Sequence, residues 1–168
     1  QISTPHVPHG WEAQVLFEIC LLMQDLGRLA ADLLLFYTQE FAFVALPEEF
    51  TTGSSIMPQK RNPDVFELIR ARSATAQACL LEALGIIAKL PSGYQRDLQL
   101  LKAPLFRSID VCQQTLALLP AALGGIAFRP ENIKLDPSLE AAAEANALAV
   151  KEGIPFREAY RRIAEKYR

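Results

Sequence analysis

The stretch that decides the fold is Thr51 to Arg70, TTGSSIMPQKRNPDVFELIR. Its first part is small and polar and is interrupted by two prolines, so residues 51–63 are predicted to form a loop, called here the 51–63 loop. Asn62 is suited to cap a following helix, and Pro63 is suited to the first helical position. A long helix is therefore predicted to begin at the end of this loop.

The 51–63 loop gathers groups that bind anions. Between Ser54 and Asn62 it carries two hydroxyls, the ammonium of Lys60 and one side-chain amide. Donors of this kind, placed on a loop with glycine next to it, suit a site for ligands that carry carboxylates. The alternative interpretation is a polar connector, in which Asn62 only caps the helix and Lys60 is only solvated.

Composition limits the class of partner. At 168 residues the chain is long enough for one domain with a hydrophobic core, or for part of a larger one. Its formal net charge is −2 and its pI is about 5.7, which argues against nucleic acid or an anionic membrane as a partner. The longest stretch without charge, residues 111–128, contains two glutamines, a proline and a glycine pair. It is predicted to be a buried helix rather than a membrane span.

The cysteines and histidines do not indicate a disulfide framework or a metal site. Cys20, Cys79 and Cys112 are odd in number and far apart, which favours a reducing cytoplasm. His6 and His9 have an i, i+3 spacing, but nearby prolines disfavour a helix, and no carboxylate or cysteine completes a ligand set. No metal ion and no cofactor are therefore predicted.

From Trp11 to about Phe43 the sequence predicts one helix of about 33 residues, which would be about 50 Å long. Apolar residues recur along it at alternating steps of four and three; this heptad row is Val15, Ile19, Leu22, Leu26, Leu29, Leu33 and Phe36. A second row repeats at steps of seven; it is Leu16, Met23, Ala30 and Tyr37. A helix that is apolar on two sides is expected at the centre of a bundle shared between subunits. The alternative is an oversized core helix of a monomer.

Two more long helices are predicted. The second runs from Pro63 to about Lys89 and is rich in alanine and poor in β-branched residues, which favours helix over strand. Pro104 and Pro120 mark the start, bend or end of the third helix, and the pair Gly124-Gly125 closes it. The predicted fold class is therefore all-α, a bundle of long helices.

A second polar stretch lies between these helices, at residues 94–102, YQRDLQLLK, called here the 94–102 segment. If a helix is under way by Asp97, Gln99 and Lys102 lie one turn apart on one face. Leucines would then pack on another face; they are Leu98, Leu101 and Leu105. The alternative is an ordinary amphipathic helix start with a solvated lysine.

The helices shorten after residue 130, and a domain boundary is predicted there. Residues 1–130 are assigned to the bundle domain and residues 131–168 to a small C-terminal helical region. That region has one helix that ends before Gly153 and a last helix that Pro155 opens. Its basic face looks a little like that of a helix-turn-helix, but the slightly acidic chain favours a solvated surface over contact with DNA.

The stretch from Gly53 to Pro63, GSSIMPQKRNP, resembles the G-S-S-x-M-P-x-K-x-N pattern of the fumarase, aspartase and argininosuccinate lyase superfamily. Two further stretches are similar to argininosuccinate lyases and their eye-lens relatives, the delta crystallins. They are LPSGYQRDLQLLK at residues 90–102 and GIPFREAY at residues 153–160. The resemblance covers the chain from Trp11 onward.

The resemblance implies a carbon-nitrogen lyase of arginine biosynthesis, a cytoplasmic homotetramer that splits argininosuccinate into arginine and fumarate by β-elimination. It assigns proton transfer to Ser54, with Ser55 adjacent and still open. Lys60 and nearby backbone N–H groups would then have to lower the pKa of the serine. It assigns substrate binding to four residues, Asn62, Tyr94, Gln99 and Lys102. Each site of such a tetramer is built from three subunits, so this chain would supply one part of it.

The sequence departs from the family pattern in two respects. Leu100 and Leu101 stand where relatives usually have acidic residues, and the family's H-x-x-x-x-x-T stretch with the catalytic histidine does not occur in the chain. The chain is therefore interpreted as the C-terminal portion of such an enzyme, inactive alone. The alternatives are a catalytically silent structural protein on the same scaffold, as in the lens, and an enzyme like adenylosuccinate lyase.

Overall fold

The computed structural model describes residues 10–91 and 93–167. The chain divides into two compact units, Gln1–Pro130 and Glu131–Arg168. The described residues form five α-helices, short 3₁₀ helices and strands of only two residues each. The all-α prediction is therefore confirmed.

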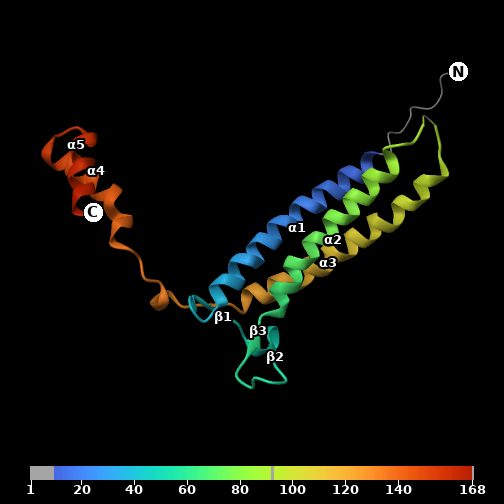
Figure 1. Ribbon diagram of the computed structural model, residues 1–168, viewed down its shortest axis with the longest axis horizontal. Helices are drawn as coiled ribbons and strands as arrows, with labels where there is room; N and C mark the ends of the chain where they lie inside the picture. The colour runs from blue at the N-terminus through green and yellow to red at the C-terminus, as the bar shows by residue number, and fades with distance from the viewer. Residues whose placement is uncertain (1–9, 92, 168) are drawn as a thin grey trace. The chain divides into compact units, whose positions relative to one another are not determined.

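The first unit is built on three long helices, which run side by side in Figure 1. They are α1 (Gly10–Tyr37), α2 (Asp64–Ile87) and α3 (Lys102–Gly124). Two antiparallel strand pairs lie in the connections: β1 (Val44–Ala45) with β4 (Ala127–Phe128), and β2 (Thr52–Gly53) with β3 (Arg61–Asn62). The 3₁₀ helices of this unit are η1 (Glu48–Phe50) before β2 and η2 (Arg96–Leu101) before α3.

Helix α1 ends earlier than the sequence predicts, at Tyr37 rather than near Phe43. The carbonyl of Leu35 accepts hydrogen bonds from both the backbone N–H (3.2 Å) and the hydroxyl (2.8 Å) of Thr38. Ala42 then adopts a φ of 48°, in the left-handed region. The chain therefore reverses before Phe43, whose N–H donates to the carbonyl of Phe36 at 2.9 Å.

Of the two predicted apolar rows of α1, the second is the more deeply buried within the chain. Leu16, Met23 and Ala30, from the second row, are at most 1% exposed. Most of the heptad row lies outward; Val15, Leu22, Leu29 and Phe36 are each 36–39% exposed. The chain covers one face of α1 and leaves the other at its surface.

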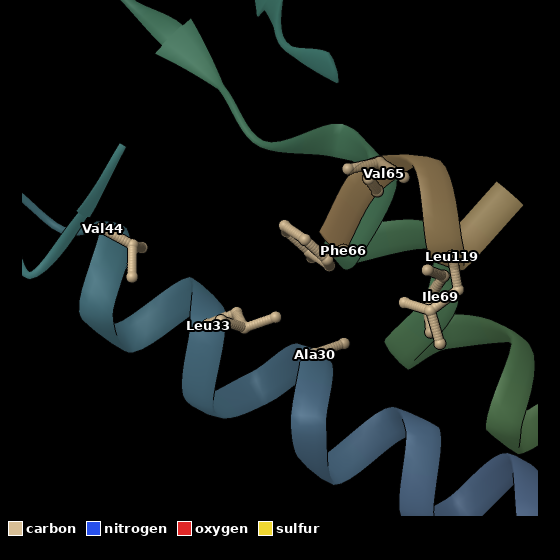
Figure 2. Close-up of a cluster of buried hydrophobic side chains, with 8 residues drawn as sticks. Ala30, Leu33, Val44, Val65, Phe66, Ile69 and Leu119 are labelled. Atoms are coloured by element: carbon tan, nitrogen blue, oxygen red, sulfur yellow. The ribbon is translucent and has the colours of Figure 1, made fainter. Parts of the chain in front are cut away.

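The core is a layer of apolar side chains between the three helices. Figure 2 shows the cluster at one end, where Ala30 and Leu33 of α1 face Phe66 and Ile69 of α2. At the other end Leu16 packs in a cluster with Cys79, Ala83 and the leucines of η2. Because early residues of α1 meet late residues of α2, the two helices are antiparallel.

Helices α1 and α2 approach each other closely at Gly27. A Cβ atom added to Gly27 would lie 3.2 Å from both Cβ and Oγ of Ser73 on α2. The absence of a side chain at this position is what permits the close approach.

The second unit is a helical hairpin of α4 (Ala141–Glu152) and α5 (Phe156–Lys166), preceded by the 3₁₀ helices η3 (Pro130–Asn132) and η4 (Pro137–Glu140). As predicted, α4 ends at Gly153, which has a φ of 65°. The carboxylate of Glu144 accepts hydrogen bonds from Lys166 Nζ (2.7 Å) and the Tyr167 hydroxyl (2.8 Å), joining α4 to the end of α5. Among the described helices, none is long and apolar enough to cross a membrane.

We predict that Gly27→Leu lowers the free energy of unfolding by about 1–3 kcal/mol, because the new side chain forces α1 away from Ser73. The matched control is Gly85→Leu on α2, where an added Cβ meets nothing within 4 Å. This control should be neutral or slightly stabilising, because leucine favours helix over glycine. Urea denaturation of both variants measures the difference, and equal losses would contradict the close contact.

The second prediction concerns pH. Hydrogen bonds from Lys166 and Tyr167 hold the pKa of Glu144 below its ordinary value. The stabilisation of the hairpin is therefore complete above the ordinary carboxyl pKa of about 4.3 and is lost as the pH falls through the lowered pKa. We expect Lys166→Met to raise the pKa of Glu144 towards its ordinary value and Lys151→Met to leave it unchanged, measured by NMR of the Glu144 side chain. The same pKa in both variants would contradict this role of Lys166.

Candidate active site

The 51–63 loop is a short β-hairpin whose base is formed by β2 and β3. Thr52 pairs with Asn62, and Gly53 pairs with Arg61. The prediction that Asn62 caps α2 is wrong: the N-cap is Pro63, and no side-chain hydrogen bond caps this helix. Pairing with β2 places Asn62 in a strand, so its amide is not committed to the helix end.

Ser54 organises the turn at the start of the loop. Its Oγ accepts hydrogen bonds from the backbone N–H groups of Ile56 (3.3 Å) and Met57 (3.2 Å), and the residue is half-buried. Ser55 is exposed. Two N–H donors stabilise an oxygen that gains negative charge, and the Ser54 oxygen accepts from two.

Lys60 stands at the other end of the same turn. Its N–H donates to the carbonyl of Met57 at 3.0 Å, closing a β-turn with Pro58 in the second position, where proline is favoured. The side chain of Lys60 is exposed, and that of Asn62 is half-buried. The structure therefore brings Ser54, Lys60 and Asn62 into one hairpin.

The segment that enters the loop is fixed to the end of α3. A Cβ atom added to Gly125 would lie 2.8 Å from Cγ of Pro47 and 3.3 Å from the Phe50 ring. The pairing of β1 with β4 supports the same contact, and Arg129 N–H donates to the Phe43 carbonyl at 2.8 Å. Only glycine at position 125 allows this approach, and no sequence pattern indicated it.

The 94–102 segment is the second group of predicted site residues. Its leucines pack as predicted, since Leu98, Leu101 and Leu105 are at most 9% exposed. The backbone from Arg96 to Leu101 is a 3₁₀ helix, with Lys102 as the first residue of α3. Gln99 and Lys102 are both exposed and are three residues apart, so they share a face in either helix type.

Two other residues of this segment bear on the site. Tyr94 is 72% exposed, so its ring and hydroxyl lie open at the surface. Of the two leucines that replace acidic residues of the family pattern, Leu101 belongs to the core and Leu100 is 65% exposed. The departure at the protein surface is therefore confined to Leu100.

The two groups lie at opposite ends of α2. The 51–63 loop comes directly before this helix and the 94–102 segment follows it (Figure 1). At 1.5 Å per residue, the 24 residues of α2 separate them by about 36 Å. A single copy of the chain therefore does not bring Lys60 together with Gln99 and Lys102.

Two contacts at the base of the hairpin have no signal in the sequence pattern. Arg61 Nη2 lies 2.8 Å from the Glu48 carboxylate, and the Thr52 hydroxyl donates to Asp64 at 2.5 Å. The partners are 13 and 12 residues apart and are joined by a turn, so no periodicity could have indicated them. In the described part of the chain, no three His, Cys, Asp or Glu side chains gather as metal ligands. His6 and His9 lie outside the described residues.

Comparison with known proteins agrees with the motifs. A family model described as lyase matches residues 7–78. Argininosuccinate lyase of Sorangium cellulosum (strain So ce56) is 52% identical over 155 residues, which cover 91% of this chain and 36% of that protein. Argininosuccinate lyase of Xylella fastidiosa (strain Temecula1 / ATCC 700964) is 48% identical over 143 residues, which cover 84% of this chain and 32% of that protein.

The chain belongs to the fumarase/aspartase lyase superfamily. A solved structure of the superfamily, EDDS lyase in complex with formate, has the same fold, with a TM-score of 0.75 and 24% identity. The match covers 90% of this chain and 31% of that one. The chain thus spans about a third of the length of the relatives that it matches.

We predict that Ser54→Ala speeds amide hydrogen exchange at Ile56 and Met57, because both N–H groups lose their acceptor. Ser55→Ala removes an equally small hydroxyl from an exposed position and should leave both amides unchanged. Exchange followed by mass spectrometry or NMR checks this. The same exchange rates in both variants would contradict the turn geometry.

Proposed function

We propose that this chain provides part of an argininosuccinate lyase, a cytoplasmic enzyme of arginine biosynthesis. The reaction is the β-elimination that splits argininosuccinate into arginine and fumarate. The proposal is supported by relatives of that name at 47–52% identity. The observation that carries it is the pair of backbone N–H groups aimed at the Ser54 oxygen.

The chemical difficulty is to remove a weakly acidic proton next to a carboxylate. A serine hydroxyl is a poor base unless its deprotonated form is stabilised. The N–H groups of Ile56 and Met57 supply part of that stabilisation at Ser54, and the charge of Lys60 in the same hairpin adds to it. The deprotonated Ser54 oxygen then takes the proton from carbon, and the electron pair of that C–H bond forms the C=C bond of fumarate. The C–N bond breaks, and its electron pair leaves with the guanidino nitrogen of arginine.

Four residues hold the substrate in this proposal: Asn62, Tyr94, Gln99 and Lys102. Each offers a hydrogen-bond donor, and Lys102 adds a positive charge, which suits the carboxylates of argininosuccinate. Asn62 serves the site at the loop end of α2. Tyr94, Gln99 and Lys102 serve the site at the opposite end, so one chain contributes to two different sites.

A complete site then needs further copies of the chain, and we propose the homotetramer of the family. The helices of the first unit carry the exposed apolar surface that such an assembly would bury. The large exposed residues of α1 are Trp11, Val15, Phe17, Leu21, Leu22, Leu29, Leu35 and Phe36. A hollow of about 290 Å³ beside Phe17, Leu80 and Leu84 interrupts this surface between α1 and α2. Surfaces of this kind mark protein interfaces.

The test is a chimera in which the aligned 155 residues of the Sorangium cellulosum enzyme are replaced by those of this chain. We predict that the chimera releases fumarate from argininosuccinate, followed by its ultraviolet absorbance. Ser54→Ala should lower kcat about 10²- to 10⁴-fold, because the positioned base is lost. Lys60→Met should lower it about 10²- to 10³-fold, because a fixed charge next to the reacting centre is lost.

The matched control is Lys89→Met, which removes an exposed lysine two residues after the end of α2 and should leave kcat unchanged. A folded, tetrameric chimera that releases no fumarate would refute the proposed activity. It would favour instead a silent structural protein on the same scaffold.

A further inference from the structure

The base of the 51–63 loop is held by contacts outside the residues assigned to chemistry. Arg61 is bound at two points: its Nη2 lies 2.8 Å from Glu48 Oε1, and its carbonyl accepts from the Tyr37 hydroxyl at 3.4 Å. Arg61 lies in β3, Glu48 lies in η1, and Tyr37 is the last residue of α1. They join the strand that leaves the loop to the segments that precede it.

Arg61 stands in sequence between Lys60 and Asn62, so its side chain decides how its neighbours are presented. Successive side chains of a strand point to opposite faces. Because Glu48 holds Arg61 to one face of β3, the adjacent Asn62 is directed to the other. Besides the ion pair, this facing depends on the two residue pairs of the short ladder, on the hydrogen bond from Thr52 to Asp64 and on the hydrogen bond from Tyr37 to the Arg61 carbonyl.

A hairpin with so short a ladder is marginal by itself, so small contributions decide how often it is formed. The carboxylate of Glu48 is 82% exposed and the Arg61 guanidinium 46% exposed, so the pair is partly screened by water. An exposed pair of this kind changes an equilibrium by up to about fivefold. That is too little to alter the fold of the unit, and it is enough to change the population of the ordered loop.

We propose that Glu48 and Arg61 are positioning residues of the lyase site. Their ion pair fixes the facing of the 51–63 hairpin, so that Ser54, Lys60 and Asn62 are presented together. Neither residue touches the substrate in this proposal. The effect of the ion pair on catalysis rests on the proposed function. Its effect on the order of the loop depends only on the hairpin geometry.

The first test measures the loop in the whole chain by amide hydrogen exchange. Glu48→Gln and Arg61→Gln should each speed exchange at Met57 and Lys60 by about two- to fivefold. Glu82→Gln, which removes the carboxylate bound to Arg107 between α2 and α3, is the control and should leave the loop amides unchanged. The double variant Glu48→Arg with Arg61→Glu reverses the pair and should restore slow exchange.

The second test repeats these variants in the chimera. The single substitutions should lower kcat about two- to fivefold with a smaller change in KM, Arg61→Lys should recover part of the loss, and the reversed pair should recover most of it. Unchanged exchange in the single variants, or fast exchange that persists in the reversed pair, would overturn the proposal. A chimera that is inactive before any substitution would count against the proposed function alone, because the exchange measurements still decide the role of the ion pair.

Discussion

The close contact between α1 and α2 is the constraint on which the first unit depends. Gly27 lets the two helices approach at Ser73. One row of α1 side chains is buried inside the bundle; it is Leu16, Met23 and Ala30. Helix α1 carries apolar rows on two of its faces. Since α2 and α3 cover mainly one of them, most of the heptad row is left at the surface, and burying it needs partners from outside the chain.

The same contact sets the distance between the two groups of site residues. Because α1 and α2 are antiparallel and long, the 51–63 loop is held at one end and the 94–102 segment at the other. The spacing is a property of helix length, about 36 Å for α2, and no side-chain motion can close it. An active site that uses both groups must therefore take them from different copies, and the uncovered row of α1 offers the surface through which copies would meet.

The sequence predicted the elements whose limits are marked by local chemistry. The start of α2 follows from Pro63, its end lies within two residues of the predicted Lys89, and Gly153 ends α4 as expected. Prediction failed where a non-local contact competes with a local preference. Asn62 is a good helix cap by type, yet it pairs with Thr52 across the hairpin, and Glu48 meets Arg61 only after the chain has turned back. Such contacts depend on the geometry of the turn in the 51–63 loop, which the sequence pattern does not indicate.

The site residues of the single chain are open to water. Lys60, Gln99 and Lys102 are exposed in the single chain and Tyr94 is 72% exposed, so water screens every charge that the reaction would use. Fixed charges stabilise a developing carbanion strongly only where water is excluded. In the proposed assembly, the association of copies would bury the outer face of α1 and cover both ends of α2 at the same time. The apolar residues that hold the copies together would then also give Ser54 and Lys60 the dry surroundings in which a serine can act as a base.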